Sequence, residues 1–168
     1  MVCCPPKPGT YVVAFRLQAE RALTVGRLGT FVFEPGLYVY VGSAFGPGGL
    51  RARVGRHWHG ARTPRWHVDY LRRTVPVAWA AWTTGKRLEC CWSQALAADM
   101  AFCVPVPGFG ASDCRSGCHA HLLVGALETS PADVLVPLVA LGRGAITLMM
   151  ASAAGGDAHH GAGGEPNG

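Results

Sequence analysis

The chain has 168 residues, 49% of them hydrophobic, and a formal net charge of +5 at pH 7. This size and composition are typical of one folded domain with a sizeable core, and they exclude a largely disordered chain. The cations are concentrated in residues 1–124, which hold fourteen Lys/Arg against six Asp/Glu, whereas residues 125–168 hold one Arg against four acids. A folded body with this excess of arginine favours a polyanionic partner, most simply nucleic acid.

The sequence has no pattern for export or for membrane insertion. Residues 1–6, MVCCPP, lack the charged start and the apolar run of a secretory signal. No uninterrupted apolar run reaches about 18 residues, and the nearest candidate, residues 134–150, is interrupted by Pro137 and Arg143. Seven cysteines, an odd number, favour free thiols or a metal site over a disulfide framework in such a chain. We therefore expect a cytoplasmic protein without a membrane partner.

The first part of the chain is predicted to be β-structure that follows a short leader. Residues 10–17 are rich in β-branched and aromatic side chains and alternate with period two, so Tyr11 shares one face with every second residue after it. Two further β segments, residues 23–25 and 30–33, flank a glycine-containing turn. This spacing predicts a hairpin inserted before the next main strand.

The central stretch of the sequence is a strand over residues 37–41, a glycine-rich turn and a basic helix over residues 50–58. On a helical wheel, Arg53 lies at the border of the apolar stripe, whereas Arg51 and Arg56 point away from it. A partly buried arginine is costly unless it faces an anion or a site. Arg53 is therefore the helix residue most indicative of function.

Three further elements complete the expected body. They are a helix over residues 65–73, a largely apolar strand over residues 75–82 and a helix over residues 88–99, in which Glu89 lies at the edge of the core face. A rigid loop and a last strand then end the body at Val124. The expected organisation is a leader at residues 1–8, a domain at residues 9–124, and an apolar, then glycine-rich, partly disordered tail at residues 125–168.

An ordered set of motifs in residues 9–124 resembles the GIY-YIG nuclease superfamily. Gly9-Thr10-Tyr11 matches the first signature with Thr in place of Ile, and Tyr40-Val41-Gly42 matches the second with Val in place of Ile. Arg53 and Glu89 match the arginine of the next helix and the later glutamate. The hairpin and three further runs resemble the Uri-type endonucleases in particular, long described only as a domain of unknown function; these runs are residues 66–71, 87–90 and 108–114.

This resemblance implies a fold and an activity. The expected fold is α/β (α+β), with a central, mainly antiparallel three-stranded sheet flanked by helices and an extra N-terminal hairpin. The expected activity is that of a metal-dependent endonuclease acting on DNA or structured nucleic acid, with Mg²⁺ or Mn²⁺ on Glu89 and Arg53 on the phosphate. Tyr11 and Tyr40 are joint candidates for activating the water, and His57 is a further catalytic candidate. The expected nucleic-acid contacts are Gly42, Ser43, Arg51, Arg56, Arg65 and His67.

The chemistry of these residue types points the same way. Cleaving a phosphodiester requires an activated water, charge stabilisation on the phosphate and assistance to the leaving oxygen. A tyrosine has an ordinary pKa of about 10, so it needs a nearby cation or metal to act as a base at neutral pH. Arg53 can offer two parallel donors to phosphate oxygens. One carboxylate, Glu89, with waters and a substrate phosphate, suits Mg²⁺.

A second group of residues raises the question of zinc. Cys114, Cys118, His119 and His121 are all potential zinc ligands. They lie within eight residues of one another, and one short loop rarely supplies all four ligands of a metal. We favour ordinary loop or core thiols here, with zinc as the alternative.

Two rival functions remain open at the level of sequence. One is a non-catalytic module that binds nucleic acid on the nuclease scaffold, and the other is a thiol or zinc interaction protein built on residues 114–121. The fold by itself does not choose among substrates. The oligomeric state and the role of residues 125–168 also stay open.

Overall fold

The computed structural model describes residues 4–141 and 144–151 of the chain. Within these residues, the elements follow one another as β1 (Gly9–Leu17), β2 (Arg21–Val25), β3 (Gly29–Phe33), β4 (Gly36–Ser43), α1 (Gly49–His59), α2 (His67–Thr74), β5 (Val77–Thr84), α3 (Glu89–Ala98), β6 (Leu122–Gly125), α4 (Pro131–Ala140) and β7 (Thr147–Met150).

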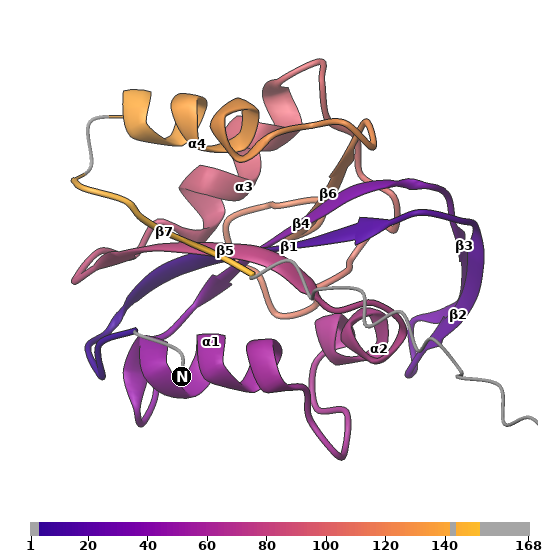
Figure 1. The fold of residues 1–168 in the computed structure, drawn as a ribbon, viewed down its shortest axis with the longest axis horizontal. Helices are drawn as coiled ribbons and strands as arrows, with labels where there is room; N and C mark the ends of the chain where they lie inside the picture. Colours follow the sequence, from indigo (N-terminus) through magenta and orange to yellow (C-terminus); the bar gives the residue numbers. More distant parts are fainter. Residues whose placement is uncertain (1–3, 142–143, 152–168) are drawn as a thin grey trace, which may run out of the picture.

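The centre of the fold is an antiparallel five-stranded sheet in the order β6-β4-β1-β5-β7 (Figure 1). The three strands predicted for the sheet, β4, β1 and β5, form its middle. The expected number of three is too small because β6, which is the predicted last strand, and β7, which was not predicted, add one strand at each edge. The predicted α+β class and the mainly antiparallel pairing are confirmed.

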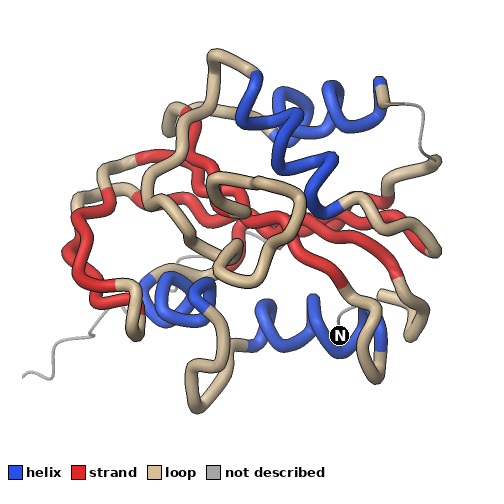
Figure 2. Tube along the Cα trace, turned by 180° about the vertical axis from the view of Figure 1, so that it is seen from behind, coloured by secondary structure: helices blue, strands red, loops and turns tan. Residues whose placement is uncertain are grey.

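Two helices cover each face of the sheet. In Figures 1 and 2, α1 and α2 lie on one side, and α3 and α4 lie on the other. The alternation of β1 divides the core accordingly: Tyr11, Val13 and Phe15 pack with α1 and α2, whereas Val12 and Ala14 pack with α3 and α4. The period-two pattern of the sequence predicted this division correctly.

The predicted hairpin is present as a separate two-stranded sheet of β2 and β3. It extends from one end of the main sheet and lies beside α2. Gly26 occupies its turn with a φ of 50°, a conformation that favours glycine. The hairpin is thus an insertion between two neighbouring strands of the main sheet, β1 and β4.

The segment before β1 packs against the start of α1. The amide of Leu50 donates to the Lys7 carbonyl at 2.9 Å, and the amide of Arg51 donates to the Pro5 carbonyl at 3.1 Å. These carbonyls satisfy first-turn amides that no side chain caps. Residues 4–8, expected as part of a leader, therefore complete the N-terminus of a helix.

The folded part of the chain continues past Val124, where we expected a tail to begin. Helix α4 starts at a capping box in which the Ser130 amide donates to Asp133 at 2.8 Å and the Asp133 amide donates to Ser130 at 3.3 Å. Val134 and Leu138 of this helix are fully or almost fully buried. The glycine-rich part of the expected tail, residues 152–168, lies outside the described residues.

The helices of this fold are short. Among the residues that the structure describes, none forms a helix with the length and apolar character needed to cross a membrane.

Candidate active site

A cavity of about 800 Å³ opens where the strand ends of β1 and β4 meet α1, the start of α2 and the start of α3. Of the residues singled out from sequence, those on its wall are Tyr11, Tyr40, Ser43, Arg53, Arg65, His67, Glu89, Cys114 and His121. Among the described residues, the predicted site residues that lie off this wall are Gly42, Arg51, Arg56, His57, Cys118 and His119.

The two tyrosines reach the same cavity because their strands pair antiparallel. Tyr11 of β1 lies opposite Gly42, and Tyr40 of β4 lies opposite Val13. Their offset of two positions keeps both side chains on one face of the sheet. The ring centroids are 6.5 Å apart, so both rings border one space, as expected from the sequence.

Gly42 supports this arrangement by leaving room for a ring. A Cβ atom at this position would lie 2.4 Å from the hydroxyl and ring carbon of Tyr11, closer than such atoms can approach. Gly42 is therefore a packing residue under Tyr11 and does not line the cavity.

We expect Gly42→Ala to displace the Tyr11 ring and to lower the free energy of unfolding by about 1–3 kcal/mol, as overpacking typically does. Chemical denaturation of the variant and of the wild type measures the difference. Gly55→Ala is the matched control, because a Cβ there meets nothing within 4 Å. Equal stability of Gly42→Ala and the wild type would contradict the close packing.

The Tyr11 hydroxyl is paired with a buried histidine. It lies 2.9 Å from Nε2 of His57, which belongs to α1 and is fully buried. Burial raises the pKa of Tyr11 well above 10 and lowers the pKa of His57 to about 4. At neutral pH, Tyr11 therefore keeps its proton. Because Nδ1 of His57 faces the Asp69 carboxylate at 3.9 Å, the tautomer with its proton on Nδ1 is favoured, and in that tautomer Nε2 accepts the Tyr11 proton.

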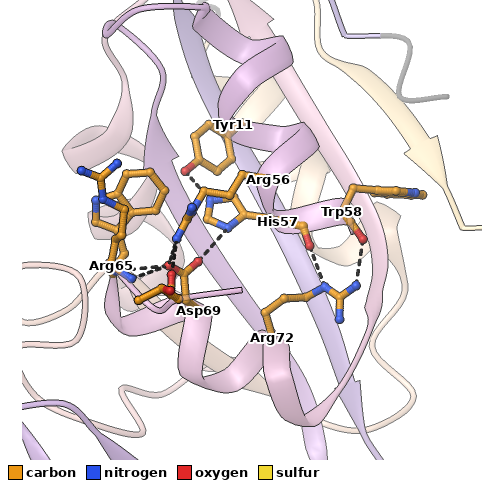
Figure 3. A network of polar contacts seen from close by, with 9 residues as sticks. Tyr11, Arg56, His57, Trp58, Arg65, Asp69 and Arg72 are labelled. Carbon is orange, nitrogen blue, oxygen red and sulfur yellow. Dashed lines mark hydrogen bonds and ion pairs between the residues drawn. The ribbon is translucent and has the colours of Figure 1, made fainter. Parts of the chain in front are cut away.

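Asp69 organises the polar network behind this pair (Figure 3). Its Oδ2 accepts hydrogen bonds from Nη2 of Arg56 at 2.7 Å and from the amides of Arg65 at 2.8 Å and Trp66 at 3.2 Å. Its Oδ1 lies 3.9 Å from Nδ1 of His57. Burial favours a raised pKa for Asp69, but these hydrogen bonds lower it below the ordinary value.

This network corrects two expectations. Arg56 was expected to point outward as a nucleic-acid contact, but it pairs with the buried Asp69 and also donates to the Thr63 carbonyl. The helix predicted from residue 65 begins at His67, because Asp69 reaches back to the two preceding amides and keeps that segment extended at Trp66.

The network predicts an acid-sensitive fold. His57 has an ordinary pKa of 6.5 and a folded pKa of about 4, so between these values the unfolded chain binds more protons. Stability is therefore expected to fall by roughly 3 kcal/mol as the pH drops from 6.5 to 4. The lowered pKa of Asp69 extends this loss to lower pH. Unfolding free energies across this pH range measure the effect.

Two variants separate the contribution of His57 to this loss of stability from the other effects of low pH on the protein. His57→Gln is expected to flatten the pH dependence between 6.5 and 4, whereas His59→Ala, which removes an exposed histidine from the same helix, should leave it unchanged. A wild-type stability that does not change over this interval would contradict the neutral, buried state of His57.

Arg53 is partly buried, as its place at the helix border predicted, and faces the cavity. Its guanidinium lies over the ring of Trp66, with 4.2 Å between the guanidinium carbon and the ring centroid. This stacking holds the charge in place by a cation–π interaction. Arg51, on the same helix, is exposed, and its Nε donates to the Cys4 carbonyl.

Glu89 is the first residue of α3, and its carboxylate faces the cavity with 29% of the side chain exposed. Its Oε1 lies 3.5 Å from Nδ1 of His121. The cavity has a net positive lining, with two carboxylates against four guanidinium groups. The charged residues on the wall are Glu89 and Asp113, and Arg53, Arg65, Arg87 and Arg115.

A loop between α3 and β6 forms the remaining wall. His67 holds this loop because its Nδ1 accepts a hydrogen bond from the Gly110 amide at 3.0 Å. Gly110 has a φ of 72°, and a Cβ there would lie 2.7 Å from the Tyr40 ring. His67, expected as a nucleic-acid contact, thus also positions the backbone that packs on Tyr40.

The predicted Cys/His cluster is present with a different membership. Ligand atoms of Cys90, Cys114, Cys118 and His121 lie within 4.8 Å of one another, an arrangement with which a protein could bind a metal. The cysteine Cys90 comes from α3 and was not expected. His119, which was expected, is exposed and outside the cluster.

Sequence reasoning missed several residues of the site region. They include Asp69, Trp66 and Cys90, and the charged wall residues Arg87, Asp113 and Arg115. Asp69 follows Trp66 by three residues, a spacing that suits a carboxylate reaching back to a helix start. Cys90 follows Glu89 directly, but its partners Cys114 and Cys118 are more than twenty residues away, so no local pattern indicates the pairing.

Comparison with protein families gives one match, over residues 10–140, to a family described as domain of unknown function DUF123. The match covers most of the chain and all elements from β1 to α4. The protein belongs to the DUF123 family. Comparisons with curated proteins and with solved structures give no match.

Proposed function

We propose that this protein is a metal-dependent endonuclease that hydrolyses phosphodiester bonds in DNA or structured nucleic acid. The observation that carries the proposal is one cavity lined by Tyr11, Tyr40, Arg53 and Glu89. These are the residues that match the ordered GIY-YIG motifs of the sequence, and they come from four separate elements. Their convergence supports the resemblance to the GIY-YIG superfamily and to its Uri-type members.

In this proposal, Arg53 binds the scissile phosphate. Its charge is held by stacking on Trp66 at the cavity wall. A guanidinium in this position can donate two hydrogen bonds to phosphate oxygens and stabilise the charge that develops during attack. Arg65, Arg87 and Arg115 extend the positive lining and suit the neighbouring phosphates of a nucleic acid.

Tyr11 is the better placed of the two tyrosines to receive a proton from the attacking water. Its hydroxyl has an acceptor, Nε2 of His57, for its own proton. The water can give a proton to the Tyr11 oxygen while the Tyr11 proton moves to His57, which then becomes an imidazolium ion facing Asp69. Tyr40 borders the same space and serves as a donor to the phosphate or the water.

Glu89 fits a divalent cation such as Mg²⁺ or Mn²⁺. Its carboxylate is partly exposed in a wide, polar cavity, with Asp113 also on the wall. One or two carboxylates, with room left for waters and substrate phosphate, suit Mg²⁺. A bound cation there would neutralise charge on the phosphate and on the leaving oxygen. The role of Glu89 itself would be to bind this cation and hold it in the cavity that Arg53 also lines.

A cleavage panel tests this proposal. The full chain is incubated with duplex, branched and single-stranded DNA and with structured RNA, in Mg²⁺ or Mn²⁺ and in chelator. We expect cation-dependent nicking of at least one substrate. Salt-sensitive binding to the panel without nicking in either cation would favour the alternative, a non-catalytic nucleic-acid-binding module on the same scaffold.

A further inference from the structure

The connection between α3 and β6 is the longest between described elements, and it has no helix or strand of its own. It covers residues 99–121 and supplies one wall of the cavity, including Gly110 and Asp113. Connections of this length without a helix or strand are uncommon inside a compact domain and usually carry a function. The cysteine and histidine side chains described above lie where this connection meets the first turn of α3.

The distances among these side chains suit a small tetrahedral metal. Tetrahedral zinc with Zn–S distances of about 2.3 Å places its sulfur ligands about 3.8 Å apart. The Sγ atoms of Cys90 and Cys114 are 3.6 Å apart, and all four ligand atoms of the cluster lie within 4.8 Å of one another. Three thiols and one imidazole are a ligand set typical of structural zinc and unlike the oxygen ligands of Mg²⁺.

An independent observation concerns His121. Its side chain is buried, and neither Nδ1 nor Nε2 has a hydrogen-bond partner within the described protein. A buried imidazole whose nitrogens make no hydrogen bond, and whose one polar contact is the Glu89 carboxylate 3.5 Å from Nδ1, is costly. One ring nitrogen bound to a metal would remove most of this cost. The contact with Glu89 is made by Nδ1.

We propose that Cys90, Cys114, Cys118 and His121 bind one structural Zn²⁺ that fastens the 99–121 connection to the start of α3. With four protein ligands the coordination is complete, so this metal holds structure and does not bind substrate. It fixes the loop wall beside Glu89, since Cys90 is the next residue of the same helical turn. The inference does not depend on nuclease activity.

The test is the metal content of the full chain, purified under reducing conditions without chelator or a metal-binding tag. We expect about one zinc per chain by elemental analysis. Cys114→Ser and Cys118→Ser should lower the zinc content about tenfold or more. The matched controls are Cys91→Ser and His119→Ala, which change the neighbouring cysteine and the exposed histidine and should retain zinc.

A second measurement guards against variants that fail to fold. Reduced, metal-free wild-type protein is titrated with Co²⁺, which should give the intense visible bands of tetrahedral thiolate coordination and lose them when Zn²⁺ is added. Wild-type protein that is folded by circular dichroism, yet carries only trace zinc and gives no such bands, overturns the proposal. A Cys90–Cys114 disulfide in freshly reduced and purified protein, or equal zinc loss in His119→Ala, also overturns it.

Discussion

Replacing Arg53 with alanine is expected to lower the single-turnover cleavage rate by about 100- to 1,000-fold, the usual effect of removing one donor that stabilises transition-state charge. Arg53 stacks on Trp66 at the wall of the cavity that Glu89 and the two tyrosines also line. Because the Arg53 side chain is only partly buried and lines a cavity, we expect Arg53→Ala to retain the fold. Circular dichroism and thermal unfolding check this.

Arg51→Ala is the matched control for that prediction. It removes the same charge from the same helix, but Arg51 is exposed and lies off the cavity wall. General electrostatic attraction to nucleic acid should weaken similarly in both variants, and added salt should reduce this effect. The cleavage rate at saturating protein should fall only in Arg53→Ala. Equal rates for the two variants would contradict the role assigned to Arg53.

The second large effect concerns stability. Asp69→Ala is expected to lower the free energy of unfolding by about 3–5 kcal/mol, because it leaves Arg56 and two backbone amides without their acceptor in a buried site. Asp69→Asn retains the shape and one acceptor oxygen, so its loss should be smaller. Urea denaturation with matched transition slopes measures both.

Two further variants show where this loss arises. Adding Arg56→Ala to Asp69→Ala should cost little more, because Arg56 has already lost its carboxylate partner and keeps only the exposed hydrogen bond to the Thr63 carbonyl. Glu20→Ala, which removes an exposed carboxylate, should leave stability almost unchanged. If Asp69→Ala is no less stable than Glu20→Ala, the network around His57 does not hold the helices α1 and α2 together.

The central elements could be predicted from the sequence because their patterns are local. The alternation of β1 sets which face carries Tyr11, and the wheel position of Arg53 separates it from Arg51 before any contact is known. Once β1 and β4 pair antiparallel, these local features place the two tyrosines together. The placement of the two tyrosines therefore follows from periodicity combined with one pairing, whereas the proposed roles of Tyr11, Tyr40, Arg53 and Glu89 came from the motif resemblance.

The parts that were missed depend on contacts between distant segments. Residues 147–150 form strand β7 because they pair antiparallel with the edge of β5. Nothing in their own sequence specifies β5 as the partner. The local pair Ser130 and Asp133 has the spacing of a capping box and could have predicted the start of α4. It was overlooked because the region after Val124 was interpreted as an apolar tail.

The metal cluster shows the same limit. Sequence proximity grouped His119 with Cys114 and Cys118, whereas the fold exposes His119 and brings Cys90 across from α3 instead. Likewise, Arg56 appeared to be a free surface cation because its partner, Asp69, lies on the next helix. Ligand and ion-pair assignments required the tertiary structure, whereas the elements that carry them did not.

The most direct test of the account is the single-turnover cleavage of one panel substrate by wild type and Glu89→Gln, each in Mg²⁺ and in chelator, with their zinc contents measured. Glutamine keeps the size of Glu89 and removes its charge. We expect wild type to cleave in Mg²⁺ and not in chelator, and we expect Glu89→Gln to lose about 100-fold or more of the cleavage rate. Full activity of Glu89→Gln in the presence of chelator would contradict the account.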